Sequence, residues 1–372
     1  MTPSYLEQEI PLQAEAILRT AAACRDQLAT LGLDRGPGVP HLVLSGCGDS
    51  LFAAQLAEVI EMTSGARSVV AVEALEFSRY YVEAVTEASV VAVLSYSGDT
   101  VRAREAAVAA RSRGARVIAV TRARDGALAA LADDVISYPD LAEYSNTRTL
   151  SFQAACVVLC ELVDVLCSTG AARGPRPWAS VADWVDRACQ DAPADLARLD
   201  EIWSPGRLDE LLYLGAGPGL VAASYGAAKA YEAATIRARA VELEEFCHCQ
   251  IFSVTPGTPV VAIVPDGRCA DRAAEVLSSL AELGAATVCL SNREELGKSA
   301  TIRVALPPGL PEVYTPMVAA PFLQLLALRW AQVRGDNPDV VRNKPVNSPL
   351  IRAGTAWSPE DYLSLREGKR RP

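Results

Sequence analysis

Runs of Val, Ile and Leu recur through the first part of the chain, and segments with helical periodicity lie between most of them. The runs lie at residues 41–46, 68–74, 90–96 and 116–122, with a shorter one at 134–138. Wholly apolar strands that alternate with helices are typical of a parallel sheet covered on both faces. A helix is expected at about 51–62, and a long apolar helix at 149–168 closes this arrangement.

The same pattern returns after a segment rich in Gly, Pro and Arg at 169–195, which we interpret as a linker joined to an amphipathic helix near 180–200. Further strands are expected at 210–217, 259–265, 286–292 and 301–307, and helices at 220–236, 269–284 and 316–333. Both parts share one order, with a strand, a glycine loop and a helix first and a long apolar helix last. This order indicates a duplicated α/β unit.

The predicted fold class is therefore α/β, with two domains that each hold a parallel sheet between layers of helices, as in a flavodoxin-like three-layer sandwich. A length of 372 residues fits two domains. We expect an N-terminal helical segment at 1–30, a first domain at 31–170, a linker with its helix at 171–204, a second domain at 205–335 and a tail at 336–372. Within the tail, the segment at 337–354 lacks periodicity and is expected to pack as an extended segment.

Composition narrows the function classes. The net charge is −10 and the pI is near 5.0, which disfavours nucleic acid as a partner. No run has the length and purity expected of a membrane span, and the N-terminus lacks a basic-then-apolar signal pattern. A cytoplasmic protein without a membrane partner is therefore expected.

The ten cysteines and two histidines limit the metal and redox chemistry. Most cysteines lie inside apolar helix or strand patterns, as reduced buried cysteines do. Two histidines exclude a histidine-rich metal site. The Cys247-His248-Cys249 cluster offers too few well-placed ligands for zinc, so no metal and no cofactor are expected.

Two glycine-containing loops follow predicted strands of the first domain, at 46–50 and 95–100. In an open parallel sheet, ligands bind outside the carboxyl ends of the strands. The second loop, Ser95-Tyr96-Ser97-Gly98-Asp99-Thr100, opens a helix whose free N–H groups and dipole favour an anion, and its hydroxyls add neutral donors. Helix capping is the alternative interpretation, because Ser and Asp prefer such positions in any helix.

Lys229 and Glu232 stand three residues apart on an Ala-rich predicted helix, with Tyr225 on the same side. In isolation such a pair is ordinarily an ion pair on a solvated face. Sixteen residues after Glu232 comes His248. A carboxylate with a raised pKa suits proton transfer between neighbouring carbons, and a histidine suits proton transfer near neutral pH. A hydrogen-bonded core histidine is the alternative for His248.

The loop at 95–100 resembles the Ser-x-Ser-Gly-x-Thr sugar-phosphate loop of sugar isomerase (SIS) domains, and the loop at 46–50 is similar to their Cys-Gly-Thr-Ser loop. The chain as a whole resembles the tandem isomerase half of the glutamine–fructose-6-phosphate aminotransferases. In that family a Lys-x-x-Glu helix is followed at the same interval by a histidine from the neighbouring subunit. The resemblance implies a homodimer with shared sites, in which Glu232, His248 and Lys229 are catalytic. It implies that the substrate and its phosphate are bound by Cys47, Gly48, Ser50, Ser95, Tyr96, Ser97, Thr100 and Arg148.

The chain departs from the family pattern at several of these positions. The family has Lys-His-Gly-Pro around the histidine and Gln where Tyr96 stands. A Ser-Thr-Lys segment that contacts the sugar appears here as Arg148-Thr149-Leu150, so that Arg148 is either a phosphate clamp or a partner of Asp49. Lys344 follows an Arg-Asn pair with shortened spacing and is a possible contact from the tail.

The chain does not begin with the Cys nucleophile of a glutaminase, so glutamine-driven amination is not expected. The leading hypothesis is an isomerase or deaminase that acts on a phosphorylated hexose or amino-hexose, such as glucosamine 6-phosphate, by enolisation. A deglycase that splits fructosamine 6-phosphates is the nearest alternative. A sugar-phosphate sensor without catalysis is the alternative from a different class, and it would not need Glu232.

Overall fold

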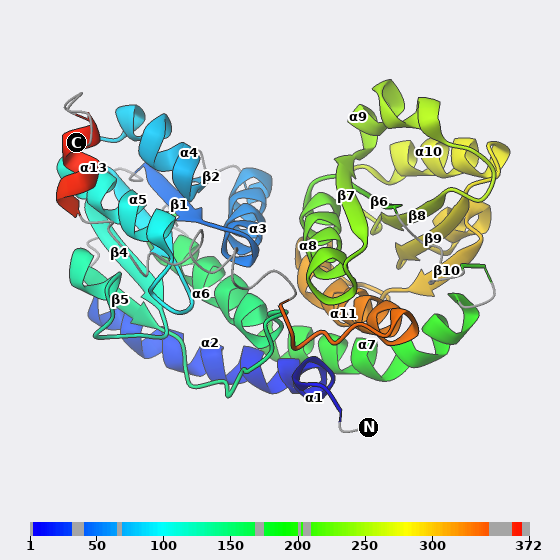
Figure 1. Ribbon diagram of the computed structural model, residues 1–372, viewed down its shortest axis with the longest axis horizontal. Coiled ribbons are helices and arrows are strands. Elements are labelled where there is room, and N and C mark those ends of the chain that lie inside the picture. The colour runs from blue at the N-terminus through cyan, green and yellow to red at the C-terminus, as the bar shows by residue number, and fades with distance from the viewer. Residues whose placement is uncertain are drawn as a thin grey trace. The chain divides into compact units, whose positions relative to one another are not determined.

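The computed structural model describes residues 3–31, 41–64, 69–167, 175–199, 202–203, 210–341 and 359–366. The chain divides into two compact units, each built around one sheet (Figure 1). The N-sheet unit comprises Ala16–Ala142, Ser151–Arg176 and Arg342–Pro372. The C-sheet unit comprises Met1–Glu15, Glu143–Leu150 and Pro177–Val341. Each unit is described by itself below.

The N-sheet unit holds five parallel strands in the order β2-β1-β3-β4-β5. The strands are β1 (Leu42–Gly46), β2 (Val69–Glu73), β3 (Val90–Leu94), β4 (Arg116–Thr121) and β5 (Asp134–Ser137). β1 and β3 are buried at every position, as wholly apolar strands in a covered parallel sheet should be. The five strands expected in this part of the chain are confirmed, with ends shifted by one or two residues.

Helices cover the N-sheet. They are α3 (Asp49–Ser64), α4 (Ala74–Arg79), α5 (Val101–Ser112) and α6 (Leu150–Cys167), with the C-terminal α13 (Pro359–Arg366) and α2 (Gln13–Thr30). One hydrophobic core joins α4 and α5 to β1, β3 and β4, and Tyr362 of α13 is buried in it. The Tyr362 hydroxyl donates a hydrogen bond to the Ser78 carbonyl at 2.7 Å, which ties α13 to α4.

Among the described residues, α6 is the one helix long and apolar enough to cross a membrane, so the expectation that no run has that character is wrong for this segment. The sequence LSFQAACVVLCELVDVLC carries only two acidic side chains. In the structure 78% of this helix is buried inside the fold, and core helices of that composition pass the same test. Composition alone therefore does not separate a buried core helix from a spanning one.

The C-sheet unit repeats the parallel arrangement, with five strands in the order β10-β9-β8-β6-β7. The strands are β6 (Glu210–Gly215), β7 (Arg237–Glu242), β8 (Pro259–Ile263), β9 (Ala286–Ser291) and β10 (Ile302–Ala305). The sequence interpretation included four of these and missed β7. The missed strand, RARAVE, lies at the sheet edge and alternates Arg237 and Arg239, which are exposed, with buried Ala238.

Helices also cover the C-sheet on both faces (Figure 1). They are α8 (Pro218–Ala234), α9 (Leu243–His248), α10 (Ala270–Glu282), α11 (Thr315–Arg334) and α7 (Trp178–Leu199). One core joins α9 and α10 to β6, β8 and β9. On α8, a Cβ at Gly226 would lie 2.8 Å from the Tyr213 ring and 3.1 Å from Leu323, so this glycine allows close packing on β6 and α11.

The N-terminal segment packs within the C-sheet unit. It contains α1 (Tyr5–Glu9) and the short 3₁₀ helix η1 (Ile10–Leu12). The backbone N–H groups of Tyr5 and Leu6 donate to the Asp339 carboxylate at 2.8 and 3.4 Å. Leu6 and Ile10 are buried in one hydrophobic cluster with Ala327 and Leu328 of α11. Most of the segment expected to be extended, at 342–354, lies outside the described residues.

The two sheets share their construction beyond the strand order. Gly46 of β1 pairs in register with Glu73 of β2, and Gly215 of β6 pairs with Glu242 of β7. Each glutamate accepts hydrogen bonds from two backbone N–H groups at the start of the following helix, α4 or α9. This correspondence supports the expected duplication at the level of structure.

Candidate functional site

The two predicted glycine loops lie side by side at one edge of the N-sheet. β1 and β3 are neighbours, and Ser45 pairs in register with Val93, so the loops at 46–50 and 95–100 leave the sheet together. The chain crosses from β1 to β2 on one side and continues to β3 on the other, so the strand order reverses between β1 and β3. This position is the topological switch point where open parallel sheets bind ligands.

The first loop is built for a close turn into α3. A Cβ on Gly46 would lie 2.7 Å from the Ser50 Cβ, and Gly48 has a φ of 56°. Cys47 donates from its Sγ to Glu73 Oε1 at 3.1 Å. Burial, followed by the hydrogen bond to Glu73, raises the pKa of Cys47 to about 12, so its thiol is neutral and acts as a donor.

The hydroxyls of the second loop bond inside the loop. Ser95 Oγ donates to Thr100 Oγ1 at 2.9 Å and accepts from the Gly98 N–H at 3.2 Å. Ser97 Oγ accepts from the Asp99 N–H at 3.2 Å. Thr100 is the N-cap residue of α5, and its side chain makes no capping hydrogen bond. The capping interpretation therefore does not describe Thr100, and the hydroxyls instead hold the shape of the loop.

Two arginines lie beside these loops, and the sequence interpretation gave neither of them a role. The Arg122 guanidinium lies 5.6 Å from the centre of the Tyr96 ring, and the Arg122 N–H donates to the Tyr96 carbonyl at 3.0 Å. Arg102, in the first turn of α5, pairs with buried Glu105, and its charge acts to lower the pKa of Cys47. Arg122 directly follows β4, the strand next to β3 in the sheet. Its place at that strand end could have predicted that it lies beside the loop at 95–100.

In the C-sheet unit, α8 carries the predicted Lys229 and Glu232. Lys229 Nζ lies 2.7 Å from Glu232 Oε2, so the ion pair is present, but only its carboxylate lies on a solvated face. The lysine side chain has no solvent exposure, whereas the glutamate side chain is 40% exposed. The Lys229 ammonium also lies 4.8 Å from the centre of the Tyr225 ring. A buried cation therefore faces a carboxylate that solvent reaches.

His248 is the last residue of α9 and is 70% exposed, so the core-histidine alternative does not describe it. Its Nε2 lies 3.3 Å from Glu244 Oε1. Cys249 is exposed, and Cys247 donates from its Sγ to the Leu243 carbonyl within the helix. Across the described parts of the chain, no three His, Cys, Asp or Glu side chains gather as metal ligands.

Arg148 lies in the segment 143–149 of the C-sheet unit, where it pairs with Glu143. Arg148 Nη1 lies 3.2 Å from Glu143 Oε2, and the Glu143 side chain is fully buried. The Arg148 side chain is 31% exposed. Its carbonyl accepts a hydrogen bond from the Tyr225 hydroxyl at 2.9 Å. The segment that carries Arg148 is thereby joined to α8. Lys344 lies outside the described residues.

The C-sheet has a loop equivalent to 95–100, since β8 occupies the position in that sheet that β3 has in the N-sheet. This loop, at 264–269, contains Gly267 and precedes α10. The Arg268 N–H donates to Glu312 Oε2 at 3.0 Å, and a Cβ on Gly267 would lie 1.8 Å from the same oxygen. The Glu312 carboxylate therefore occupies, in the loop at 264–269, the position that corresponds to the expected anion site in the loop at 95–100.

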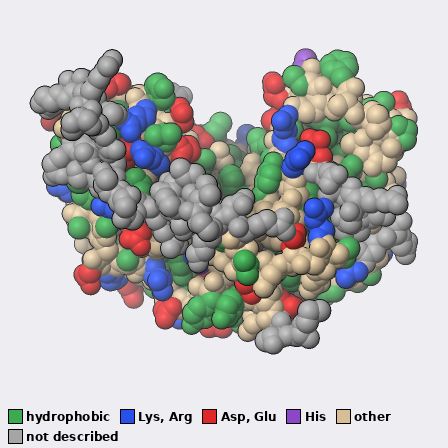
Figure 2. Space-filling model, viewed as in Figure 1, with side chains coloured by type: hydrophobic (Ala, Val, Ile, Leu, Met, Phe, Trp, Pro, Cys, Tyr) green, Lys and Arg blue, Asp and Glu red, His purple; other side chains and the backbone are tan. Residues whose placement is uncertain are grey.

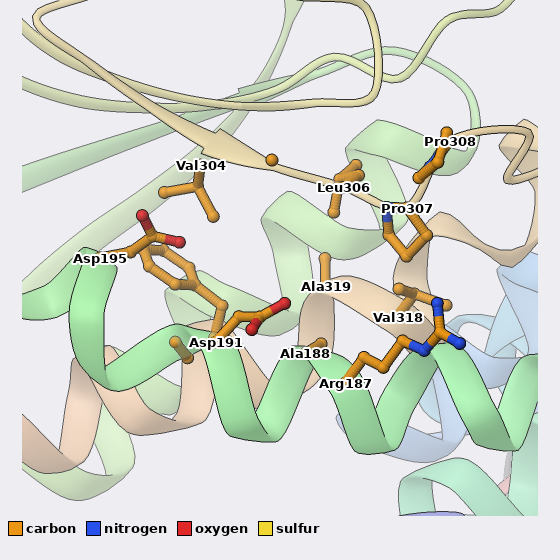
Figure 3. Close-up of a pocket in the computed structure, with 13 residues that line it drawn as sticks. Arg187, Ala188, Asp191, Asp195, Val304, Leu306, Pro307, Pro308, Val318 and Ala319 are labelled. Atoms are coloured by element: carbon orange, nitrogen blue, oxygen red, sulfur yellow. The ribbon is translucent and has the colours of Figure 1, made fainter.

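A pocket of about 180 Å³ lies in the C-sheet unit between α7, the end of β10 and α11 (Figure 3). Arg187, Asp191 and Asp195 of α7 line one side, and most of the other lining residues are apolar. None of the residues expected from the sequence lies in it. Because two carboxylates accompany one arginine, the pocket disfavours a phosphate.

The charged surface does not show one dominant sign in the view of Figure 2. On this face, Lys and Arg side chains lie among Asp and Glu side chains rather than in one continuous basic area.

Comparisons with known proteins agree with this arrangement. Residues 39–163 match the SIS domain family. The chain is 26% identical over 349 residues to a glutamine–fructose-6-phosphate aminotransferase (isomerizing) of Thermococcus kodakarensis, which covers 92% of this chain and 57% of that protein. The chain thus spans a little over half the length of the curated relatives it matches.

Solved structures share the fold. The C-terminal domain of glucosamine-fructose-6-phosphate aminotransferase from Francisella tularensis superposes with a TM-score of 0.76 at 20% identity, covering 91% of this chain and 98% of that one. Glucosamine-6-phosphate deaminase from Thermotoga maritima gives 0.65 at 18% identity, covering 87% and 95%. Residues 39–163 therefore match the SIS domain family, and the chain is similar in sequence to part of the glutamine–fructose-6-phosphate aminotransferases.

Proposed function

We propose that this chain is a sugar-phosphate isomerase or deaminase that acts by enolisation on a phosphorylated amino-hexose such as glucosamine 6-phosphate. The observation that carries the proposal is the Lys229–Glu232 pair, in which a buried ammonium holds a partly exposed carboxylate at 2.7 Å. A carboxylate fixed in this way is able to take a proton from a carbon and return it. The chain also carries its own SIS domain, and its relative from Thermococcus is named as isomerizing.

We assign the phosphate of the substrate to the loop at 95–100. Ser95, Ser97 and Thr100 supply hydroxyls there, and the first turn of α5 supplies backbone N–H groups at the positive end of its dipole. Arg122 lies next to Tyr96 and adds a cation at the same strand end. Cys47, Gly48 and Ser50 belong to the neighbouring loop and are assigned to the same ligand. Net negative charge does not oppose this assignment, because the donors are local.

The proposed chemistry begins with ring opening, in which His248 of a second copy moves a proton from the anomeric hydroxyl to the ring oxygen. Exposure of 70% of the His248 side chain leaves it available to another copy. The active form is then a homodimer whose sites are shared between copies. Lys229 has the role of keeping the Glu232 carboxylate ionised and placed.

Glu232 then removes the proton on C2 of the open-chain aldehyde, and the electrons form an enolamine between C1 and C2. The enolate oxygen O1 takes up a proton, the amine gives one up, and Glu232 delivers to C1 a proton that its carboxyl exchanges with water, which leaves an imine at C2. Water adds to the imine and ammonia leaves, which gives fructose 6-phosphate. With a hydroxyl instead of an amine at C2, the same two proton transfers interconvert an aldose and a ketose phosphate without loss of a group. One carboxylate serves both outcomes, since each is an enolisation.

A direct assay tests this function. The protein is incubated with glucosamine 6-phosphate, and ammonia and fructose 6-phosphate are measured. The proposal expects both products in equal amounts. Amine release from a fructosamine 6-phosphate, with glucosamine 6-phosphate left unchanged, would instead make the chain a deglycase. Thermal stabilisation by sugar phosphates without any turnover would make it a sensor.

A further inference from the structure

A chain of buried amide and hydroxyl groups runs through the C-sheet unit and ends beside both candidate site segments. Gln13 and Gln324 exchange hydrogen bonds through their side-chain amides at 2.8 and 3.0 Å. Gln324 Nε2 also donates to the Tyr225 hydroxyl at 2.7 Å. All three side chains are fully buried. Gln13 at the start of α2 is therefore hydrogen-bonded to Gln324 of α11, which in turn is hydrogen-bonded to Tyr225 of α8.

Tyr225 connects this chain of hydrogen bonds to two parts of the proposed site. Its hydroxyl donates to the Arg148 carbonyl at 2.9 Å, while its ring lies 4.8 Å from the Lys229 ammonium. Lys229 follows Tyr225 by one helical turn and holds Glu232 at 2.7 Å. One side chain thus contacts both the buried cation and the main chain of the segment 143–149.

Other hydrogen bonds also fix the segment 143–149. Glu143 Oε1 accepts from the Thr149 N–H at 2.8 Å, and Glu143 Oε2 pairs with Arg148. Glu9 of α1 accepts from the Ser145 N–H at 2.8 Å. Because its main chain is bonded from several directions, a shift of Arg148 relative to α8 requires the Tyr225 hydrogen bond to break.

A space-filling role does not account for the Tyr225 hydroxyl. Tyr213 of β6 is also fully buried and packs against α8 at Gly226, yet its hydroxyl has no hydrogen-bond partner among the residues that the structure describes. This core therefore accommodates a tyrosine whose hydroxyl does nothing further. The Tyr225 hydroxyl differs, since it accepts one hydrogen bond and donates another.

We infer that Tyr225 is a positioning residue that fixes the Lys229–Glu232 pair and the Arg148 segment relative to each other. The inference deepens the proposed function and rests on it for the catalytic consequence. Tyr225 does not exchange protons with substrate in this account. It acts through Lys229, whose charge its ring faces, and through the Arg148 main chain.

The test compares Tyr225→Phe with the matched control Tyr213→Phe. Both variants remove one buried tyrosine hydroxyl, but only Tyr225→Phe removes hydrogen bonds to Arg148 and Gln324. Amide hydrogen exchange over 143–149 is measured together with steady-state turnover of glucosamine 6-phosphate. Gln324→Met, which removes the donor to Tyr225, serves as a second variant if Tyr225→Phe does not fold.

We expect Tyr225→Phe to speed exchange at 143–149 and to lower kcat/KM at least about tenfold, whereas Tyr213→Phe changes neither. Unchanged exchange in Tyr225→Phe overturns the inference, and this readout holds even if the wild-type protein turns over no sugar phosphate. Faster exchange with wild-type kinetics would leave Tyr225 a structural residue only and would also overturn it. Absence of turnover in the wild-type protein contradicts the proposed function separately.

Discussion

Lys229 Nζ lies 2.7 Å from Glu232 Oε2, and the two side chains differ sharply in exposure, at 0% and 40%. Burial of the Lys229 ammonium is tolerated because the Glu232 carboxylate balances its charge, since a buried ammonium without a counter-charge is costly. The Glu232 carboxylate has less need of the Lys229 charge, since water also solvates it. This asymmetry makes the effects of the two substitutions on stability different.

Glu232→Gln should lower the free energy of unfolding by about 1–3 kcal/mol, because it leaves the Lys229 charge buried opposite a neutral amide. Lys229→Met should cost about 1 kcal/mol or less, since methionine fits a buried position and the carboxylate keeps its water. Urea denaturation of the two variants measures the difference. Equal losses, or a larger loss in Lys229→Met, would contradict the assignment of the lysine as the dependent partner.

The loop at 95–100 is tested through its glycine. Gly98 has a φ of 75°, and a Cβ there would lie 3.1 Å from Thr121 Oγ1. Gly98→Ala should therefore cost about 1–2 kcal/mol and weaken binding of sugar phosphates by at least about tenfold, because the loop must change its backbone. Isothermal titration calorimetry with glucosamine 6-phosphate measures the affinity.

Gly114→Ala is the matched control for Gly98→Ala. Gly114 follows the other end of α5 with a φ of 78°, so alanine is strained there too. It should lose comparable stability and keep the wild-type affinity. If both variants lost affinity equally, the effect would come from general destabilisation, and the loop would lose its assignment as the phosphate site.

Much of the fold could be predicted from the sequence because wholly apolar strands leave a simple pattern. Of the ten strands in the described parts of the chain, nine follow runs of Val, Ile and Leu between glycine loops and helices. β7 was missed because an edge strand has fewer buried positions, and RARAVE places Arg237 and Arg239 at alternate positions that face solvent. Local composition there resembles a charged loop more than a strand.

The candidate site could be predicted only in part. The residues at strand ends and on α8 carry local signals, such as hydroxyls beside glycine and two charges among alanines. The burial of Lys229 could not be predicted from the neighbouring residues, because a Lys-x-x-Glu spacing occurs equally in ion pairs on solvated helix faces. The ion pair of Arg148 with Glu143 and the hydrogen bond from Tyr225 depend on how the chain folds in three dimensions. The hydrophobic pattern of the sequence does not predict such contacts.

Glu9 predicts a pH dependence of stability. Burial, before any other cause, raises the pKa of Glu9 above its usual 4.5, partly offset by hydrogen bonds from Ser145 and Tyr144. A carboxyl with a raised folded pKa contributes stability below its unfolded pKa and loses that contribution as pH rises through the folded value. The wild-type protein should therefore gain stability relative to Glu9→Gln as pH falls from neutral toward 4.5.

Thermal midpoints of the wild-type protein and Glu9→Gln, measured as a function of pH, check this prediction. The comparison removes the contributions of other titrating groups, since both proteins share them. A constant difference, or a gain for Glu9→Gln as pH falls, would contradict it.

Glu312 occupies the loop at 264–269 of the C-sheet unit, and its removal should make that loop accessible to an external anion. Glu312→Ala removes the exposed hydrogen bond from the Arg268 N–H, which should cost about 0.5–1.5 kcal/mol. Inorganic phosphate should then raise the thermal midpoint of Glu312→Ala by more than it raises that of the wild-type protein. Equal shifts in the two proteins would show that the carboxylate does not stand in for an anion.

The shared site predicts complementation between two inactive variants. Glu232→Gln and His248→Ala should each lack activity as homodimers. After mixed refolding, half of the dimers are mixed, and each has one site with both residues intact, so about a quarter of the wild-type activity should return. No recovery in the mixture, with mixed dimers present by mass spectrometry, would place His248 outside the neighbouring copy's site.

Exchange of the C2 proton of glucosamine 6-phosphate in deuterated water, followed by NMR, tests the enolisation most directly. The account predicts that the wild-type protein exchanges this proton, and that Glu232→Gln binds the sugar phosphate without exchanging it. Exchange by Glu232→Gln at the wild-type rate, or a wild-type protein that binds the ligand and leaves C2 unlabelled, would contradict it.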